Sequence, residues 1–280
     1  MKKFLIFVIT GLLVFGSCAS TNVVYLSGVI ADKEFEVDLS YASLKVSNAV
    51  QVIYSEDATV LTLSADSAVL PYLQVKEKGG ELKIFMDCPY SVFKGGNIGE
   101  IKAVVPASHS LTRLELSGAS SLRGGKLDVR EFTLSLSGAS FLDLDLNTAS
   151  KIDMTVTGAS KCHSSIVANS VAINASGASR IYSSVNAESL AMEVSGASDA
   201  DVSGKVGKYS LEASGAANVS SGREIVETET FVCGISGASK AVVRCNVSAN
   251  GDVSGASSIK IYGNASVDIS SSGASSVIRK

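Results

Sequence analysis

Hydrophobic and polar residues alternate along most of the chain after residue 109, and one short phrase interrupts the alternation at near-regular intervals. The phrase is [S/T]-G-A-[S/A], and it occurs nine times at glycine-to-glycine spacings of 20, 20, 19, 19, 19, 22, 18 and 18 residues. Strict alternation is typical of half-buried β-strands, so we expect a strand on each side of every copy. The repeat glycines are Gly118, Gly138, Gly158, Gly177, Gly196, Gly215, Gly237, Gly255 and Gly273.

Alignment of the nine copies on the glycine gives columns of matching character. The column four residues before the glycine is mostly apolar and runs Leu114, Leu134, Met154, Ile173, Met192, Leu211, Cys233, Gly251 and Ile269. The columns six and two residues before and four residues after are also mainly apolar, whereas the columns three before and three after are mainly polar. Such uniform columns indicate that equivalent residues stack on one another in space.

A unit of about 19 residues with two short strands has no room for a helix. One repeat per coil of a parallel β-helix fits this length, with coils spaced about 4.8 Å apart. The sequence therefore predicts an all-β parallel β-helix, or solenoid, with about 19 residues per coil. The phrase is expected at a bend, where glycine adopts backbone conformations that a Cβ would forbid.

The N-terminal third lacks the phrase but still has strand-like segments. These are Glu34 to Leu39, Leu44 to Tyr54, Thr59 to Ser64, Leu82 to Met86 and Ile101 to Val105. Residues 39–43 look like a decayed repeat with Tyr41 in the glycine position. We expect residues 19–108 to form degenerate β coils that cap the repeats of residues 109–280, because an open coil exposes unpaired backbone groups. A separate small β-domain is the alternative.

Residues 1–18 have the pattern of a targeting segment and are set aside from the fold. Lys2 and Lys3 precede an apolar run that is shorter than the roughly 20 residues needed to span a bilayer. The run ends in small residues before Cys18, which is typical of a lipoprotein signal whose cysteine is acylated after cleavage. An ordinary signal peptide cut near the same place is the alternative. We therefore predict export, lipidation at Cys18 and an outer-membrane lipoprotein that faces the periplasm or the cell surface.

Charge and cysteine content narrow the list of partners. Without Lys2 and Lys3, the chain has 22 basic and 27 acidic residues and a net charge of −5. This negative charge argues against nucleic acid as a partner. Cys162 and Cys233 lie in apolar columns several coils apart, so we predict free, buried thiols. No metal-binding spacing is present, and no cofactor or metal is predicted.

Several features together resemble one known family. They are the repeated SGAS, the segment Phe35 to Leu39, the strand Lys83 to Asp87 and the stretch IKIYGNASVDISSSGASSV near the end. These residues resemble the head GIN domain family, which carries the label putative auto-transporter adhesin, over about residues 30–280. The resemblance implies a right-handed parallel β-helix on a secreted or lipid-anchored protein of the Gram-negative envelope.

One polar stripe is the strongest candidate site. Two neighbouring columns, three and five residues after the repeat glycine, place charged and aromatic residues in successive coils. There are three alternatives for the function. The protein could bind a glycan or another protein, or it could be a purely structural periplasmic protein. It could also be a polysaccharide lyase or hydrolase that uses Asp199, Asp201 and His163. The plainest interpretation is a solvated face whose alternating signs avoid like-charge stacking, and His109 is expected in a loop. We favour a non-enzymatic binding scaffold, touching the membrane through its lipid alone. The stripe comprises Arg123, Asp143, Lys161, His163, Arg180, Tyr182, Asp199 and Asp201.

Overall fold

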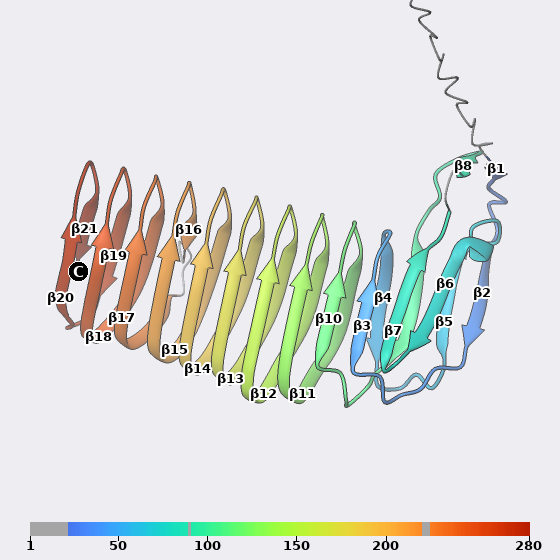
Figure 1. The fold of residues 1–280 in the computed structure, drawn as a ribbon, viewed down its shortest axis with the longest axis horizontal. Coiled ribbons are helices and arrows are strands. Elements are labelled where there is room, and N and C mark those ends of the chain that lie inside the picture. Colours follow the sequence, from blue (N-terminus) through green and yellow to red (C-terminus); the bar gives the residue numbers. More distant parts are fainter. Residues whose placement is uncertain (1–21, 89–90, 220–224) are drawn as a thin grey trace, which may run out of the picture.

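A stack of parallel β coils makes up most of the molecule (Figure 1). The computed structural model describes residues 22–88, 91–219 and 225–280, so the predicted signal segment and Cys18 lie outside the described residues. From β10 to β21, each strand pairs in parallel with its equivalent in a neighbouring coil. These strands are β10 (Arg113–Leu116), β11 (Ser121–Leu136), β12 (Phe141–Val156), β13 (Lys161–Ala175), β14 (Arg180–Val194), β15 (Asp199–Ala213), β16 (Asn218–Val219), β17 (Val226–Ile235), β18 (Lys240–Val253), β19 (Ser258–Tyr262), β20 (Ser266–Ser271) and β21 (Ser276–Arg279).

The predicted columns are confirmed as physical ladders. Leu114 pairs with Leu134, Leu134 with Met154 and Met154 with Ile173, and the same register continues to Ile269. Apolar columns face a continuous core, and the residues between them face solvent. The change from a 20-residue to a 19-residue spacing is absorbed by a register shift between Asn147 and Lys151, where β12 pairs with β13. Between β11 and β12, two register shifts, from Arg123 to Lys126 and from Val129 to Glu131, cancel each other.

The repeated glycines are required by the bend at which each coil turns. All nine have a positive φ between 71° and 80°. The alanine that follows donates its N–H to the glycine carbonyl of the preceding coil, as from Ala178 to Gly158 at 2.8 Å. A Cβ on Gly177 would lie 2.8 Å from that same carbonyl oxygen. Both the backbone conformation and the close stacking therefore exclude a side chain here.

The two serines of the phrase have different environments. The serine before the glycine is half-buried in most copies, whereas the residue after the alanine points inward and is buried. In the buried column, the Ser179 hydroxyl donates to the Ser198 hydroxyl at 3.1 Å, and the Ser140 N–H donates to the Ser160 hydroxyl at 3.3 Å. The column thus gives some neighbouring coils a polar link inside an apolar core.

A tenth copy of the bend occurs in the N-terminal third, but not where the sequence suggested. Ser47-Asn48-Ala49 stands in register with the first SGA phrase, because Val46 pairs with Leu116 and Val52 with Leu122. Asn48 has a φ of 66°, and asparagine is among the few non-glycine residues that tolerate this region. The interpretation of Tyr41 as a glycine replacement is wrong. Tyr41 is instead buried, and its hydroxyl donates to the carbonyl of Pro106.

Antiparallel pairs extend this first coil on both flanks. β3 (Ser43–Val46) pairs in parallel with β7 (Glu81–Met86), which pairs antiparallel with β6 (Leu73–Lys78). β4 (Val50–Ser55) pairs in parallel with β9 (Ile101–Pro106), which pairs antiparallel with β5 (Leu61–Asp66). β2 (Ile30–Phe35) continues the sheet beyond β5, and the 3₁₀ turn η1 (Leu70–Tyr72) precedes β6. The division at residue 108 stays a prediction, and the apolar core runs unbroken from Tyr41 to Ile261.

Two short strands lie apart from the main sheet at the N-terminal end (Figure 1). β1 (Asn22–Tyr25) and β8 (Ser91–Lys94) form a parallel two-stranded ribbon. The sequence did not predict β1, β6 or β8. His109 lies in the turn between β9 and β10, as expected.

All four cysteines in the described part of the chain are free. Cys162, Cys233 and Cys245 are buried, and Cys88 is half-buried. Burial raises the pKa of both the Cys162 and the Cys233 thiols to about 12. These two residues serve as small core hydrophobes, as their columns indicated.

Candidate functional site

The predicted stripe exists as two adjacent outward columns on one flank of the solenoid. Arg123, Asp143, His163, Tyr182 and Asp201 pair in that order through β11 to β15. The neighbouring column places Lys161 beside Arg180 and Arg180 beside Asp199. The register of the stripe is therefore as the alignment indicated, whereas its binding role stays a prediction.

Aromatic rings stack along the middle of this stripe, which the sequence analysis did not single out. The rings of Phe141 and His163 lie edge to face at 5.3 Å between centroids, and those of His163 and Tyr182 at 5.0 Å. The guanidinium of Arg123 lies 5.2 Å from the Phe141 centroid. Phe141 was overlooked because it belongs to the neighbouring column and is in contact with His163 only across the strand gap. The rings form a continuous aromatic ladder over three coils.

Two cations lie side by side on the same surface. Lys161 and Arg180 are direct partners in the parallel ladder of β13 and β14, and both are exposed. Like charges directly opposite each other destabilise a sheet, so alternation of sign does not explain this pair. A shallow hollow there is lined by Phe141, Lys161, His163, Arg180 and Tyr182, without a carboxylate. The nearest ion pair of Arg180 is long, with 3.9 Å between its Nε and an Asp199 oxygen.

The suggested catalytic trio does not meet in one place. Tyr182 stands between His163 and Asp201, so these two lie two coils apart. At about 4.8 Å per coil, the separation is too large for direct proton exchange between them. Asp199 is exposed and faces Arg180. The arrangement presents an open surface rather than a closed reaction site.

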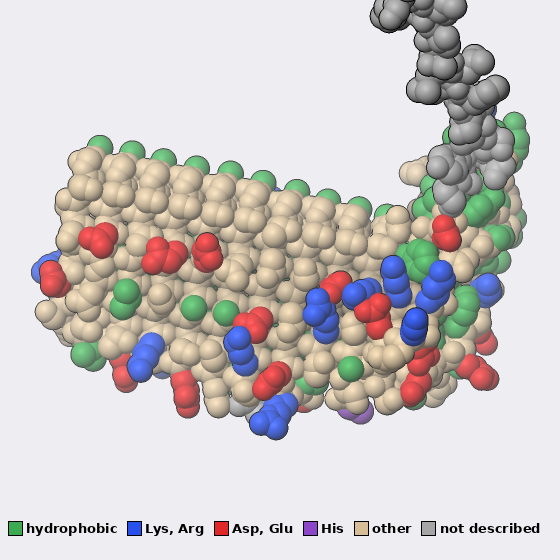
Figure 2. Space-filling model, viewed as in Figure 1, with side chains coloured by type: hydrophobic (Ala, Val, Ile, Leu, Met, Phe, Trp, Pro, Cys, Tyr) green, Lys and Arg blue, Asp and Glu red, His purple; other side chains and the backbone are tan. Residues whose placement is uncertain are grey.

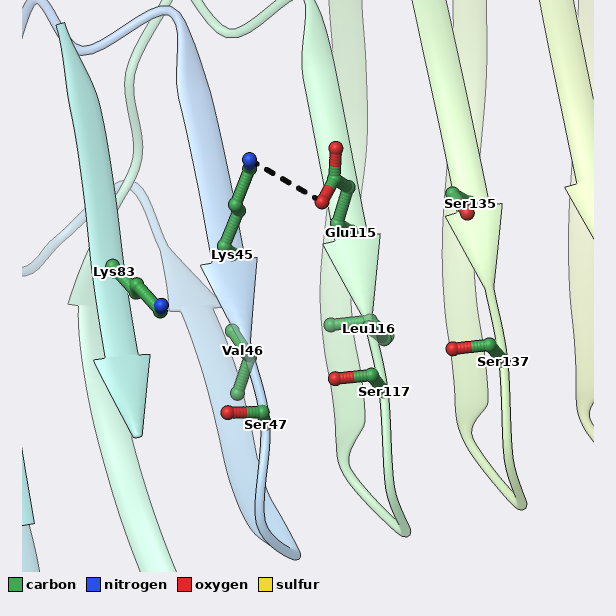
Figure 3. A pocket seen from close by; sticks show the side chains of 9 residues that line it. All are labelled: Lys45, Val46, Ser47, Lys83, Glu115, Leu116, Ser117, Ser135 and Ser137. Carbon is green, nitrogen blue, oxygen red and sulfur yellow. Dashed lines mark ion pairs between the residues drawn. The ribbon is translucent and has the colours of Figure 1, made fainter. Parts of the chain in front are cut away.

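A second hollow lies on the other flank near the first coils, and its lining is shown in Figure 3. There Lys45 makes ion pairs of 2.8 Å with Glu81 and 3.5 Å with Glu115. The hydrogen bond to Glu81 and the charge of Glu115 raise the pKa of Lys45. Ser47, Ser117 and Ser137 follow one another along the adjacent bends (Figure 3). Because Lys45 and Glu115 pair with each other and the Lys83 ammonium lies over the Phe85 ring, we interpret this hollow as a structural junction between the first coils and the repeats.

Neither a metal cluster nor a membrane-spanning helix is found among the residues that the structure describes. No group of three or more histidine, cysteine or acidic side chains there is arranged to hold a metal ion. No helix in the same part of the chain is long and apolar enough to cross a membrane.

Structural comparison identifies several solved proteins with the same fold. A putative adhesin from Parabacteroides distasonis is 14% identical, with a TM-score of 0.64 over 92% of this chain and 100% of its own. A putative adhesin from Parabacteroides merdae, also 14% identical, has a TM-score of 0.63 over 92% of this chain and 99% of its own. A putative lipid binding protein from Parabacteroides distasonis, again 14% identical, has a TM-score of 0.60 over 92% of this chain and 100% of its own. At this identity the likeness concerns the fold.

Sequence comparison with family models gives a match over most of the chain. The family described as "Putative auto-transporter adhesin, head GIN domain" matches residues 40–165 and 150–265. No protein with a curated description matches the sequence. The family description suggests a non-enzymatic protein associated with the envelope or cell surface. Together with the SGAS ladders and the β-solenoid, the match shows that the chain belongs to the head GIN domain family.

Proposed function

We propose that the protein is a non-enzymatic scaffold of the cell envelope, anchored by a lipid at Cys18, whose solenoid flank binds an anionic glycan. The observation that carries this proposal is the adjacent pair Lys161 and Arg180 beside the aromatic ladder. A glycan has apolar ring faces that pack on aromatic side chains, and uronic acid carboxylates would neutralise the two cations. The family description as an adhesin supports a binding role.

The surface fits an extended polymer better than a small molecule. The hollow is open and shallow, and its residues come from three consecutive coils in β12, β13 and β14. Equivalent side chains therefore repeat about every 4.8 Å along the solenoid axis. A chain of sugar residues laid along this axis would contact Phe141, His163 and Tyr182 in turn.

Calorimetry with oligogalacturonate tests this function, with a neutral cello-oligosaccharide of equal length as the comparison. We expect binding of the acidic oligomer alone, and we expect Tyr182→Ala and Lys161→Glu each to weaken it about tenfold or more. Lys240→Glu is the matched control, because Lys240 occupies the same column as Lys161 without the aromatic ladder beside it. Absence of binding, or equal binding by all variants, would contradict the proposal.

The location of the domain is tested separately. Antibody against the solenoid should label intact cells if the domain faces outward and only permeabilised cells if it faces the periplasm. Labelling of intact cells would fit capture of glycans from the surroundings. Labelling only after permeabilisation would direct the search to glycans of the envelope itself.

An enzymatic role is the second candidate, and the same polymers test it. If Asp199 and Asp201 acted on a polysaccharide, the wild-type protein would shorten oligogalacturonate, and the double substitution to alanine would abolish this with the fold intact. We expect no cleavage by either protein, measured by chromatography of the oligomers.

A further inference from the structure

The ribbon of β1 and β8 has an unusual surface, since it is apolar on both faces. Val24 and Phe93 are partners in the ribbon and half-buried, and the Phe93 ring packs on Tyr72 at 5.7 Å between centroids. The opposite face is exposed, with Val23 45% and Tyr25 70% accessible to solvent. A strand at the surface of a soluble domain normally has polar residues on that outer face.

More exposed apolar side chains lie on β8 of this ribbon and in the segment that follows β1. Val92, the partner of Val23, is 43% accessible, and Val29 and Ile30 just after β1 are 61% and 64% accessible. Val23, Tyr25, Val29, Ile30 and Val92, here called the N-terminal patch, account for five of the twelve large exposed hydrophobic residues in the described chain. Figure 2 shows hydrophobic side chains gathered around this end of the molecule.

The turn that carries Val29 is held in place by hydrogen bonds. Asp66 accepts hydrogen bonds from the N–H of Ser27 at 3.1 Å and of Gly28 at 2.8 Å, and from the Ser27 hydroxyl at 2.9 Å. Asp66 is itself 5% accessible and belongs to β5 of the main sheet. Val29 and Ile30, which follow this turn, are therefore presented from a fixed position on the solenoid.

The sequence also limits how far this patch can be from a lipid anchor. Cys18 stands four residues before Asn22, where β1 begins. A fully extended chain spans at most about 3.6 Å per residue, so the acylated cysteine would lie within about 14 Å of β1. Apolar side chains of peripheral proteins sink about 5–10 Å into the headgroup region, and tyrosine is enriched there. The patch would thus be within reach of the bilayer that holds the lipid.

We propose that the N-terminal patch inserts into the membrane interface beside the lipid anchor and provides a second contact between the protein and the bilayer. This inference rests on the lipid anchor of the proposed function, and it replaces the expectation from the sequence that the lipid alone touches the membrane. An apolar contact beside the anchor adds buried hydrophobic area to the attachment and fixes how the domain lies on the bilayer. Lys94, which pairs with Tyr25 at the edge of the patch, can extend its ammonium group toward the headgroups.

The lack of tryptophan in this chain allows a direct test. A single Tyr25→Trp substitution places the only indole within the patch, and Tyr182→Trp places it on the aromatic ladder as the matched control. Both proteins are bound to phosphatidylcholine vesicles with and without brominated acyl chains. We expect a blue shift and bromine quenching for Tyr25→Trp, and neither for Tyr182→Trp. An unquenched Tyr25→Trp on vesicle-bound protein would overturn the proposal.

Further measurements separate this inference from the anchor and from self-association. Mass spectrometry of the mature chain reports acylation of Cys18 independently. A Cys18→Ser protein should still bind weakly at high lipid concentration, and Val23→Ser with Val92→Ser should reduce that partitioning about tenfold. Equal partitioning of the Cys18→Ser protein with and without the two serine substitutions would overturn the proposal that the patch inserts, even if Cys18 of the wild-type protein is acylated. A blue shift of Tyr25→Trp that depends on protein concentration without vesicles would also overturn it, in favour of a second copy as the occupant.

Discussion

At the scale of single residues, the positive φ and close stacking at the bend make glycine necessary. We expect Gly177→Ala to lower the free energy of unfolding by about 2 kcal/mol or more, because φ is +80° and the added Cβ would lie 2.8 Å from the Gly158 oxygen. Urea unfolding followed by circular dichroism measures the change. Gly125→Ala is the control, since no atom lies within 4 Å of its Cβ position and its φ is not positive.

A loss of similar size at Gly125 would contradict this explanation, because the Gly125 site has neither a positive φ nor a close neighbour, and alanine restricts the unfolded chain more than glycine does. The natural exception, Asn48, sits in the equivalent place with a φ of 66°. Its side chain tolerates this conformation at some cost, so Asn48→Gly should be neutral or slightly stabilising.

The buried thiols give a second prediction at this scale. Burial raises the pKa of Cys162 and of Cys233 to about 12 from the usual 9.0, so both stay protonated and unreactive at pH 8. In a Cys18→Ser protein we expect a thiol reagent to modify only the half-buried Cys88 in the native state, and all four thiols after unfolding. Rapid native labelling of Cys162 or Cys233 would contradict the structure.

The sign of the linked pH effect follows from the same shift. The unfolded chain releases these protons near pH 9, while the folded chain holds them until about pH 12. The free energy of unfolding should therefore fall as pH rises between these values. Cys162→Ala should show a shallower fall than wild type, measured by urea unfolding at pH 8 and pH 10.

At the scale of strands, alternation decides which face of β14 is buried. Met192 is 3% accessible, and Glu193 next to it is exposed. Met192→Glu would place a carboxylate in the apolar core and should lower stability by about 3 kcal/mol or more. Glu193→Met should change stability by less than about 0.5 kcal/mol. Thermal unfolding of the two variants distinguishes them, and equal losses would mean that the assigned faces are wrong.

The same alternation explains how much of the fold the sequence predicts. Columns such as Leu114 to Ile269 could be aligned because equivalent positions in each coil have the same environment. The same type of residue therefore recurs at each repeat of the sequence. The N-terminal strands have no repeat, so no alignment of columns could reveal β6, which pairs antiparallel with β7, or β8, which pairs in parallel with the distant β1. Asn48 was missed because the search began from glycine, although Ser47 and Ala49 preserve the phrase around it.

The candidate site was predictable in part for a related reason. Register along the stripe follows from the repeat, so the neighbours of His163 could be named. The ring contact between Phe141 and His163 depends on how two columns meet across neighbouring strands, which the alignment does not show. Lys161 and Arg180 lie in one column, so their opposition follows from the repeat itself.

At the scale of the whole molecule, each coil is in contact mainly with its two neighbours, so stability should grow almost as a sum over coils. Deletion of residues 237–254 removes one repeat and joins Ser236 to Gly255, which restores the phrase. Ser254 and Ser236 occupy equivalent places before their glycines, and Val253 pairs with Ile235. The shortened chain should therefore continue the ladders without a change of register.

We expect this deletion variant to fold with an unchanged β-type circular dichroism spectrum and a modestly lower urea midpoint. Deletion of residues 237–245 alone is the matched control. It removes half a coil, so the following strands no longer reach equivalent partners and apolar columns turn toward solvent. This protein should be unfolded or aggregated. If both deletions unfolded the chain equally, the solenoid would behave as one indivisible unit, and its stability would not be additive over coils.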